Sequence, residues 1–311
     1  MDAAIDILNL SRSFGDIIAV NRISMSIQPG EMFGLVGPDG AGKTTTIRML
    51  CGILAPTSGT AIILGHDIVS RPDAVKKEIG YLSQRFTLYG DLTIDENIEF
   101  FAEINNVYDY KPRREELLAF TRLTPFRNRL AERLSGGMKQ KLALACTLIH
   151  TPRIIFLDEP TTGVDPVSRR DFWKILQSLL KSGITIVMST PYLDEAERCS
   201  RVALMNRGRI MIADTPAGVQ KAMKGEVIEI VLERVRDAFI LIKDSSLVRE
   251  VQAFGDRLNV IVDDARRDFP PVAEAMSAAG IPVDSHRVIS PSLENVFISL
   301  LTHNGFQEGV L

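Results

Sequence analysis

The N-terminal part of the chain alternates strand patterns with helical ones. Apolar and polar residues alternate in DILNLSRSF and NRISMSIQ, which predicts two strands, and Pro29-Gly30 marks the turn that follows. The apolar run EMFGLVG ends in glycine, and Ile47, Leu50 and Leu54 then recur at helical spacing. These patterns predict a strand, a glycine-rich loop and a helix, in that order.

The middle of the chain changes to helical spacing and then returns to strands. Thr93 and Glu96 fit a capping box, and the apolar spacing after them predicts a mainly helical region at about 86–149. The runs IIFLDEP and GITIVMST predict buried strands, and RVALMNRGRIMIAD predicts a hairpin that turns at Arg207-Gly208. Strands that alternate with helices indicate an α/β domain with a largely parallel sheet.

Two proline pairs indicate further helix starts. Asp165-Pro166 and Thr190-Pro191 each place a capping residue before a proline, and proline suits the first helical position. We therefore expect a helix to begin at each pair, the second one covering Tyr192 to Cys199.

The pattern changes again after about residue 225. Short segments predict strands in VIEIVLE, LVREVQAF, LNVIVDD and IPVDSHRVI, and helical spacing predicts helices in PPVAEAMSAAG and PSLENVFISLLTH. We therefore predict a large α/β domain at 1–225 and a small C-terminal α/β domain at 226–311.

Composition indicates a soluble globular protein. The chain has 311 residues, 45% hydrophobic and 24% charged, and a formal net charge of -3, which leaves no general basic surface for nucleic acid. The sequence has no apolar run of the ~18 residues that span a bilayer, and its N-terminus lacks a secretory signal pattern. We expect a cytoplasmic protein in which Cys51, Cys146 and Cys199 are buried and reduced.

The segment GPDGAGKTT fits the phosphate-loop pattern G-x-x-x-x-G-K-[ST] between a strand and a helix. Its glycines let backbone amides point at phosphate oxygens, and the helix adds its positive end. Lys43 is expected to neutralise the β and γ phosphates, and the Thr44 hydroxyl to bind Mg²⁺. The predicted nucleotide-binding residues of this loop are Gly37, Pro38, Asp39, Gly40, Ala41, Gly42, Lys43, Thr44 and Thr45.

A carboxylate pair follows the buried strand of IIFLDEP. Asp158 is expected to hold the metal, usually through water, and Glu159 to polarise the water that attacks the γ phosphate. Two carboxylates at a strand end can also be solvated edge residues. The phosphate loop in the same chain favours the functional interpretation.

The segment LSGGMKQK opens another helix, with Ser135 as its N-cap. Capping does not explain Gly136 and Gly137, which cost backbone entropy and expose amides at a helix N-terminus. We therefore predict a second anion site at Ser135, Gly136 and Gly137.

A phosphate loop, LSGGMKQ and LDEP in that order resemble the ATP-binding cassette (ABC) ATPases over about residues 1–225. The resemblance implies a P-loop NTPase fold of ABC type, with a mixed sheet core, an antiparallel β part and a helical signature subdomain. It also implies that two cassettes face each other head to tail, as a homodimer or a heterodimer. Each ATP would then lie between the phosphate loop of one cassette and the signature of the other.

The resemblance implies further site residues. Gln84 matches the glutamine that senses Mg²⁺ and takes part in catalysis, although it could be an ordinary strand-end residue. Phe14 matches the aromatic that stacks on adenine, but a lone aromatic is more often part of a core. Asp165 matches a loop residue at the dimer interface, and the same residue can also cap a helix.

The C-terminal segment PSLENVFISLLTH resembles the ending of ATP-binding subunits from ABC-2-type exporters, including drug-efflux systems. In that group this segment closes an accessory domain, whose role would be dimer contact or regulation. The segment is also an amphipathic helix that packs on its own domain. The resemblance implies a separate ABC-2-type transmembrane permease as partner, and a peripheral location on the cytoplasmic face of the cell membrane.

Pro191 departs from the family pattern. The residue after Ser-Thr is usually a histidine that hydrogen-bonds the γ phosphate, and proline offers neither a side-chain donor nor a backbone hydrogen. Hydrolysis could be slow with Glu159 sufficient, or it could depend on a second, non-identical ATPase. In a third alternative, Ser189 or Thr190 supplies the missing donor.

The sequence therefore predicts an ATP-binding and ATP-hydrolysing subunit that powers an ABC-2-type exporter with ATP and Mg²⁺. One alternative is an ATP-binding regulatory subunit with little hydrolysis, which Pro191 favours. The other is a soluble ABC ATPase that acts on DNA or ribosomes. The compact segment between phosphate loop and signature, and the single cassette, speak against the latter.

Overall fold

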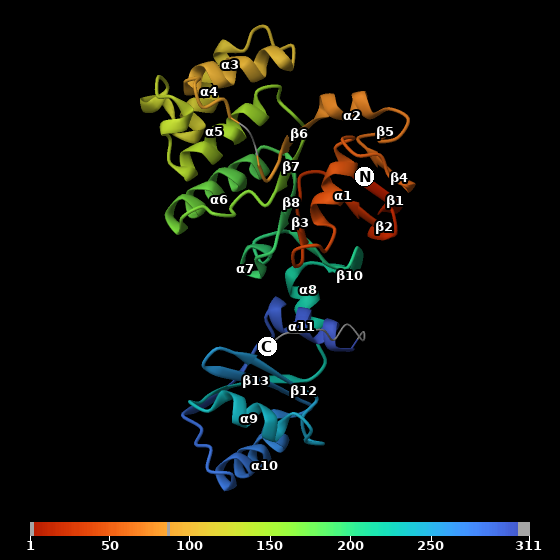
Figure 1. Ribbon diagram of the computed structural model, residues 1–311, viewed down its shortest axis with the longest axis vertical. Coiled ribbons are helices and arrows are strands. Elements are labelled where there is room, and N and C mark those ends of the chain that lie inside the picture. The colour runs from red at the N-terminus through yellow and green to blue at the C-terminus, as the bar shows by residue number, and fades with distance from the viewer. Residues whose placement is uncertain (1–2, 86–87, 304–311) are drawn as a thin grey trace. The chain divides into compact units, whose positions relative to one another are not determined.

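The computed structural model describes residues 3–85 and 88–303, which form two compact units. The first unit ends at Ala213 and the second begins at Asp214. Helix α8 (Pro216–Lys221) therefore belongs to the second unit, although the sequence placed the domain boundary after it, at about residue 225. Each unit is described by itself below (Figure 1).

A six-stranded sheet forms the centre of the first unit. Its neighbouring strands β6, β7, β8, β3 and β9 are parallel to one another, so the predicted parallel core is confirmed. The apolar runs IIFLDEP and GITIVMST become β7 and β8, both fully buried as expected for central parallel strands. In spatial order the strands are β10 (Arg209–Asp214), β9 (Arg201–Asn206), β3 (Met32–Val36), β8 (Thr185–Thr190), β7 (Ile154–Asp158) and β6 (Ile79–Leu82).

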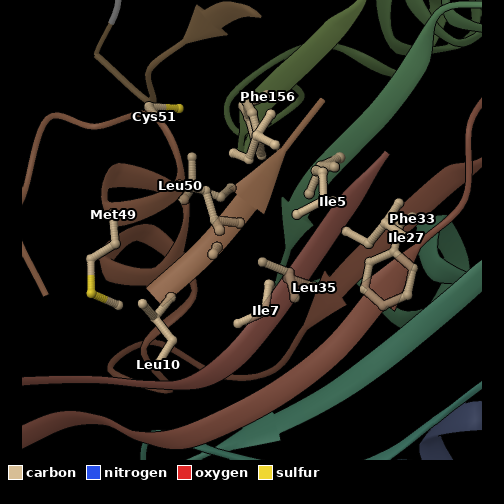
Figure 2. Packing of buried hydrophobic residues seen from close by; sticks show 14 of the residues in the cluster. Ile5, Ile7, Leu10, Ile27, Phe33, Leu35, Met49, Leu50, Cys51 and Phe156 are labelled. Atoms are coloured by element: carbon tan, nitrogen blue, oxygen red, sulfur yellow. The ribbon is translucent and has the colours of Figure 1, made fainter. Parts of the chain in front are cut away.

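A second, antiparallel sheet packs beside the first and closes the main core. Its strands in spatial order are β2 (Ile17–Ile27), β1 (Ile5–Phe14), β4 (Ser58–Ile63) and β5 (His66–Asp67). Alternating residues of β1, such as Ile5 and Ile7, face Leu35 of β3 and Phe156 of β7 (Figure 2). The alternation seen in the sequence thus turns one face of this sheet toward the core.

Helix α1 (Lys43–Leu50) packs into the same core through Met49 and Leu50 (Figure 2). This packing fixes the N-terminal end of α1 where the glycine-rich loop leaves β3. Helix α2 (Pro72–Glu78) leads into β6.

The described residues from 88 to 149 are mainly helical, as predicted, whereas 86 and 87 lie outside the described residues. Helices α3, α4 and α5 pack together (Figure 1). Thr93 and Glu96 form the predicted capping box of α3. The elements here are α3 (Ile94–Ile104), α4 (Lys111–Thr121), the 3-10 turns Thr124–Phe126 and Ala131–Arg133, and α5 (Gly136–Leu148).

One predicted helix start is confirmed and the other is wrong. Asp165 caps α6 (Pro166–Lys181). Thr190, by contrast, is the last residue of β8, and α7 (Leu193–Ala196) starts after Tyr192 and is much shorter than predicted. The Thr190 hydroxyl accepts the Tyr192 N–H over 3.0 Å, so it closes a local turn before the helix instead of capping it.

The second unit is a four-stranded antiparallel sheet with helices, which confirms its predicted α/β character. The sequence missed α9, and it placed the start of α10 too late, because Pro270 and Pro271 lie within the first turns of that helix. The strands in spatial order are β12 (Glu250–Phe254), β13 (Arg257–Val262), β11 (Glu226–Val231) and β14 (Ser285–Ile289), and the helices are α9 (Val235–Ile242), α10 (Ala265–Ala278) and α11 (Leu293–His303).

Within residues 3–85 and 88–303, no helix has both the length and the apolar character needed to cross a membrane. All three cysteines are free and buried, as the sequence predicted.

Candidate nucleotide site

The phosphate-loop glycines are required by backbone geometry. Gly42 has φ +101°, a left-handed conformation that disfavours side chains, and a Cβ on it would lie 2.5 Å from Ala19 O. A Cβ on Gly37 would lie 2.1 Å from Met205 O. The loop thus lies tightly packed between β2 and the end of β9, and it leads into α1, whose first N–H groups are left for an anion.

Lys43 is folded back over the loop. Its Nζ donates to Gly37 O at 2.7 Å and to Pro38 O at 3.1 Å, and it lies 3.4 Å from Glu159 Oε1. The side chains of this ion pair are only 3% and 7% exposed. The positive charge expected to meet phosphates is therefore held at the mouth of the loop, paired with the candidate base.

Asp158 ends β7 directly beside α1. Its Oδ1 accepts hydrogen bonds from Thr44 Oγ1 at 2.9 Å and from Ser189 Oγ at 2.6 Å. Its Oδ2 is buried and accepts no hydrogen bond from any residue that the structure describes. An uncompensated buried carboxylate oxygen next to a threonine hydroxyl fits Mg²⁺, which prefers oxygen ligands. Thr44 and Asp158 are the residues that could hold the ion.

Glu159 has an unusual backbone conformation, φ +49°, immediately after the strand. Its N–H donates to Ser189 Oγ at 3.0 Å, and its Oε2 accepts from Gln84 Nε2 at 3.0 Å. Gln84 follows β6, so parallel strands bring two distant sequence segments together at one sheet edge. The structure thus brings together Lys43, Thr44, Gln84, Asp158 and Glu159, the residues singled out in the sequence.

The signature segment lies at the start of α5. Ser135 caps this helix, since its Oγ accepts the Met138 N–H at 3.3 Å. A Cβ on Gly137 would lie 2.3 Å from Ser168 Oγ of α6, whereas one on Gly136 would meet nothing within 4 Å. The second glycine is thus needed for close packing of two helices, and the first leaves backbone open at a helix N-terminus.

Asp165 caps α6 by accepting the N–H groups of Val167 and Ser168 at 3.1 and 3.0 Å. These contacts, above all the hydrogen bond from the Ser168 amide, lower the pKa of the Asp165 carboxyl. The capping role suggested for this residue is therefore present, and its carboxylate stays ionised.

Comparison with known proteins agrees with this geometry. Residues 20–162 match the family model described as "ABC transporter". The chain is 33% identical over 308 residues to the daunorubicin/doxorubicin resistance ATP-binding protein DrrA of Streptomyces peucetius, covering 96% of this chain and 93% of that protein. This chain belongs to the ABC transporter ATP-binding proteins.

Other similarities place the chain within that family. It is 39% identical to the protein of Escherichia coli described as "Probable multidrug ABC transporter ATP-binding protein YbhF", over 100% of this chain but only 54% of YbhF. The chain therefore spans about half the length of that relative. An ATP-binding cassette solved as a dimer in a post-hydrolysis state, bound to ADP and Pi, is 26% identical with TM-score 0.61, over 68% of this chain and 98% of that one. The first unit has the ABC-type P-loop fold.

In this ABC protein Phe14 is exposed, with 46% of its surface accessible, at the end of β1. The Arg12 guanidinium lies 4.6 Å from the ring centroid. A role for Phe14 in the core is therefore wrong, and the Arg12 guanidinium lies over the exposed ring.

The segment around Pro191 contains interactions that the sequence did not reveal. The Ser189 hydroxyl donates to Asp158, and the Thr190 hydroxyl donates to Glu195 Oε2 at 2.8 Å. Both hydroxyl protons are thus engaged, so neither is directed at a nucleotide in place of the usual histidine. Glu195 was missed because it lies in an acidic segment that reads as an exposed helical face, and only the tertiary structure buries it.

Proposed function

We propose that this chain is the ATP-hydrolysing subunit of an ABC-2-type exporter. The proposal rests on one observation. Five side chains contact one another at the end of the parallel sheet: Lys43, Thr44, Gln84, Asp158 and Glu159. Similarity to a drug-resistance ATP-binding protein over most of both chains supports the exporter type. Similarity alone does not name a cargo, which the permease would select.

Each residue would have a distinct part in hydrolysis. Lys43 would bind the β and γ phosphates, and Thr44 with Asp158 would hold Mg²⁺, which neutralises charge on the phosphates. Glu159 would take the proton of the attacking water. Gln84, already hydrogen-bonded to Glu159, would orient that carboxylate toward the water.

The proposed working unit is a pair of cassettes bound to a membrane permease at the cytoplasmic face. Ser135, Gly136 and Gly137 would bind the nucleotide held by the opposite cassette, with Asp165 near the interface. ATP drives such a transition only because it binds the closed pair better than the open one. The dimeric post-hydrolysis structure of a related cassette supports this arrangement.

Mg²⁺-dependent ATP hydrolysis by the purified chain, beside its Glu159→Gln variant, tests the proposal. We expect turnover in the wild type, near-complete loss in Glu159→Gln, and retained ATP binding in both. Equal hydrolysis by the two proteins would remove Glu159 from the mechanism. ATP binding without turnover in either would require the assay to be repeated with the permease reconstituted in vesicles.

A regulatory ATP-binding subunit is the second candidate, and Pro191 is the observation that favours it. Loss of one transition-state hydrogen bond costs about 100- to 1000-fold in rate. ATP binding without Glu159-dependent turnover, even with the permease present, would support this second function.

The magnesium site has its own test. Thr44→Val removes the hydroxyl that contacts Asp158, so it is expected to raise the Mg²⁺ concentration needed for half-maximal ATP binding or hydrolysis. Thr44→Ser keeps the hydroxyl and is the matched control. Equal Mg²⁺ dependence in both variants would argue against Thr44 as a ligand.

A further inference from the structure

Glu195 is a buried carboxylate in the first unit, with 1% of its surface exposed. Its Oε1 accepts from Thr161 Oγ1 at 2.6 Å, and its Oε2 accepts from Thr190 Oγ1 at 2.8 Å. An ionised carboxylate in such a place is costly unless it is paired and hydrogen-bonded. Both of its oxygens are satisfied by hydroxyls, one of them 34 positions earlier in the chain and the other five positions earlier.

A positive charge lies beside the same carboxylate. Arg169 Nε of α6 lies 3.7 Å from Glu195 Oε1, and the Arg169 guanidinium carbon lies 5.0 Å from the ring centroid of Tyr192. The guanidinium therefore contacts both the carboxylate and the segment that follows Pro191. Glu195 is thus the centre of a cluster drawn from α6, α7, the end of β8 and the loop after β7.

The two threonines place this cluster next to the reaction site. Thr161 lies in the loop directly after Glu159, and the neighbouring Thr162 Oγ1 is 3.4 Å from Glu159 Oε2. Thr190 lies directly before Pro191 and ends β8. The Glu195 carboxylate therefore joins the loop that carries the candidate base to the segment where the family histidine is replaced.

The backbone of Glu159 needs such support. Its φ of +49° is a conformation that non-glycine residues rarely adopt, and strain of this kind persists only when the surroundings over-determine it. On its N-terminal side, the Glu159 N–H is fixed by Ser189. On its C-terminal side, the hydrogen bond from Thr161 to Glu195 holds the loop.

We propose that Glu195 is a positioning residue for hydrolysis, which holds the Glu159 loop against the Thr190–Pro191 segment. Glu195 acts through Thr161 and Thr190 and does not touch the nucleotide. The inference rests on the proposed ATPase function. In a chain whose residue 191 has no side-chain donor, Glu195 adds a connection from β8 to the loop after Glu159, besides the contact that Ser189 makes with the Glu159 N–H.

Two isosteric substitutions test this role, one at a hydrogen-bond donor to Glu195 and the other at Glu195 itself. Thr161→Val removes one donor to Glu195 and leaves Thr190 and Arg169 in place, whereas Glu195→Gln keeps the shape and removes the charge. The matched control is Thr121→Val, because the Thr121 hydroxyl is buried in α4 and donates to Leu117 O at 2.7 Å, within its own helix.

We expect kcat to fall about 10- to 100-fold in Thr161→Val and in Glu195→Gln, as for a lost hydrogen bond to a charged group. The Kd for MgATP should change less than about threefold, and the double variant should lose little more than either single one. Thr121→Val should keep wild-type kcat. Wild-type kcat in Thr161→Val or Glu195→Gln, or an equal fall in Thr121→Val, would overturn the proposal.

Hydrogen exchange separates this inference from the ATPase proposal. Peptides covering residues 158–164 and 189–193 should exchange faster in Thr161→Val and Glu195→Gln than in the wild type, with the rest of the first unit unchanged. This readout applies even if the wild type does not hydrolyse ATP, in which case only the ATPase proposal fails. Unchanged exchange in both peptides would overturn the positioning role, whatever the turnover.

Discussion

Lys43 Nζ lies 3.4 Å from Glu159 Oε1, so the lysine expected to bind phosphate is paired with the carboxylate expected to activate water. Both belong to the same parallel-sheet edge, one after β3 and the other after β7. A bound γ phosphate would compete with Glu159 for this lysine, and the two negative groups would repel each other.

Glu159→Gln is therefore expected to bind MgATP more tightly than the wild type. Removing one of two unit charges about 4 Å apart is worth about 1 kcal/mol in bulk water and more at a site as buried as this one, so Kd should fall at least about fivefold. Calorimetric titration with MgATP under non-hydrolysing conditions measures this change. The gain should shrink at high salt, and a weaker affinity in Glu159→Gln would contradict the electrostatic explanation.

Gly137→Ala is expected to destabilise the first unit. The added methyl would lie 2.4 Å from Ser168 Cβ, and overpacking of this kind costs about 1–3 kcal/mol. The single tryptophan, Trp173, is buried in α6 of the same unit, so urea unfolding followed by its fluorescence reports on this unit.

Gly136→Ala is the control for that experiment, because its methyl would meet nothing within 4 Å. Ser168→Gly should recover part of the stability lost in Gly137→Ala. Equal urea midpoints for the two alanine variants would show that α5 and α6 can shift apart to fit the methyl group with little loss of stability.

Pro191→His is expected to raise turnover if the missing donor limits the chemical step. One transition-state hydrogen bond is worth about 100- to 1000-fold, which sets the upper limit of the gain. Single-turnover hydrolysis measures the chemical step directly. An unchanged rate in a folded variant whose chemical step is limiting would mean that Pro191 does not slow ATP hydrolysis in this chain.

The three thiols are expected to resist alkylation in the native protein. Burial raises the pKa of Cys51 and Cys146, and it raises the pKa of Cys199 to about 12. At pH 8 a thiol of pKa 12 is ionised in about one molecule in ten thousand, and only the thiolate reacts. Iodoacetamide labelling with and without guanidinium measures this. Rapid native labelling at any one thiol would contradict its burial.

The site motifs could be predicted from sequence because each depends on local geometry. A strand, a glycine loop and a helix start at Lys43 suffice to predict a phosphate site, and Asp165-Pro166 suffices to predict a helix cap. The same reasoning failed at Thr190-Pro191. Local propensity favours a cap there, but β8 pairs with β7 as far as Ser189 and with β3 as far as Thr190, which extends the strand through Thr190.

The sequence by itself determined which residues are candidates to bind the nucleotide, because phosphate recognition uses consecutive backbone groups and fixed spacing. Only the tertiary structure decided how those residues are held. Thr161, Thr190 and Glu195 look like ordinary polar residues along the chain, and they form a buried cluster only once β7, β8, α6 and α7 are packed. Burial of a charge requires partners from several elements, and no local pattern records which elements will supply them.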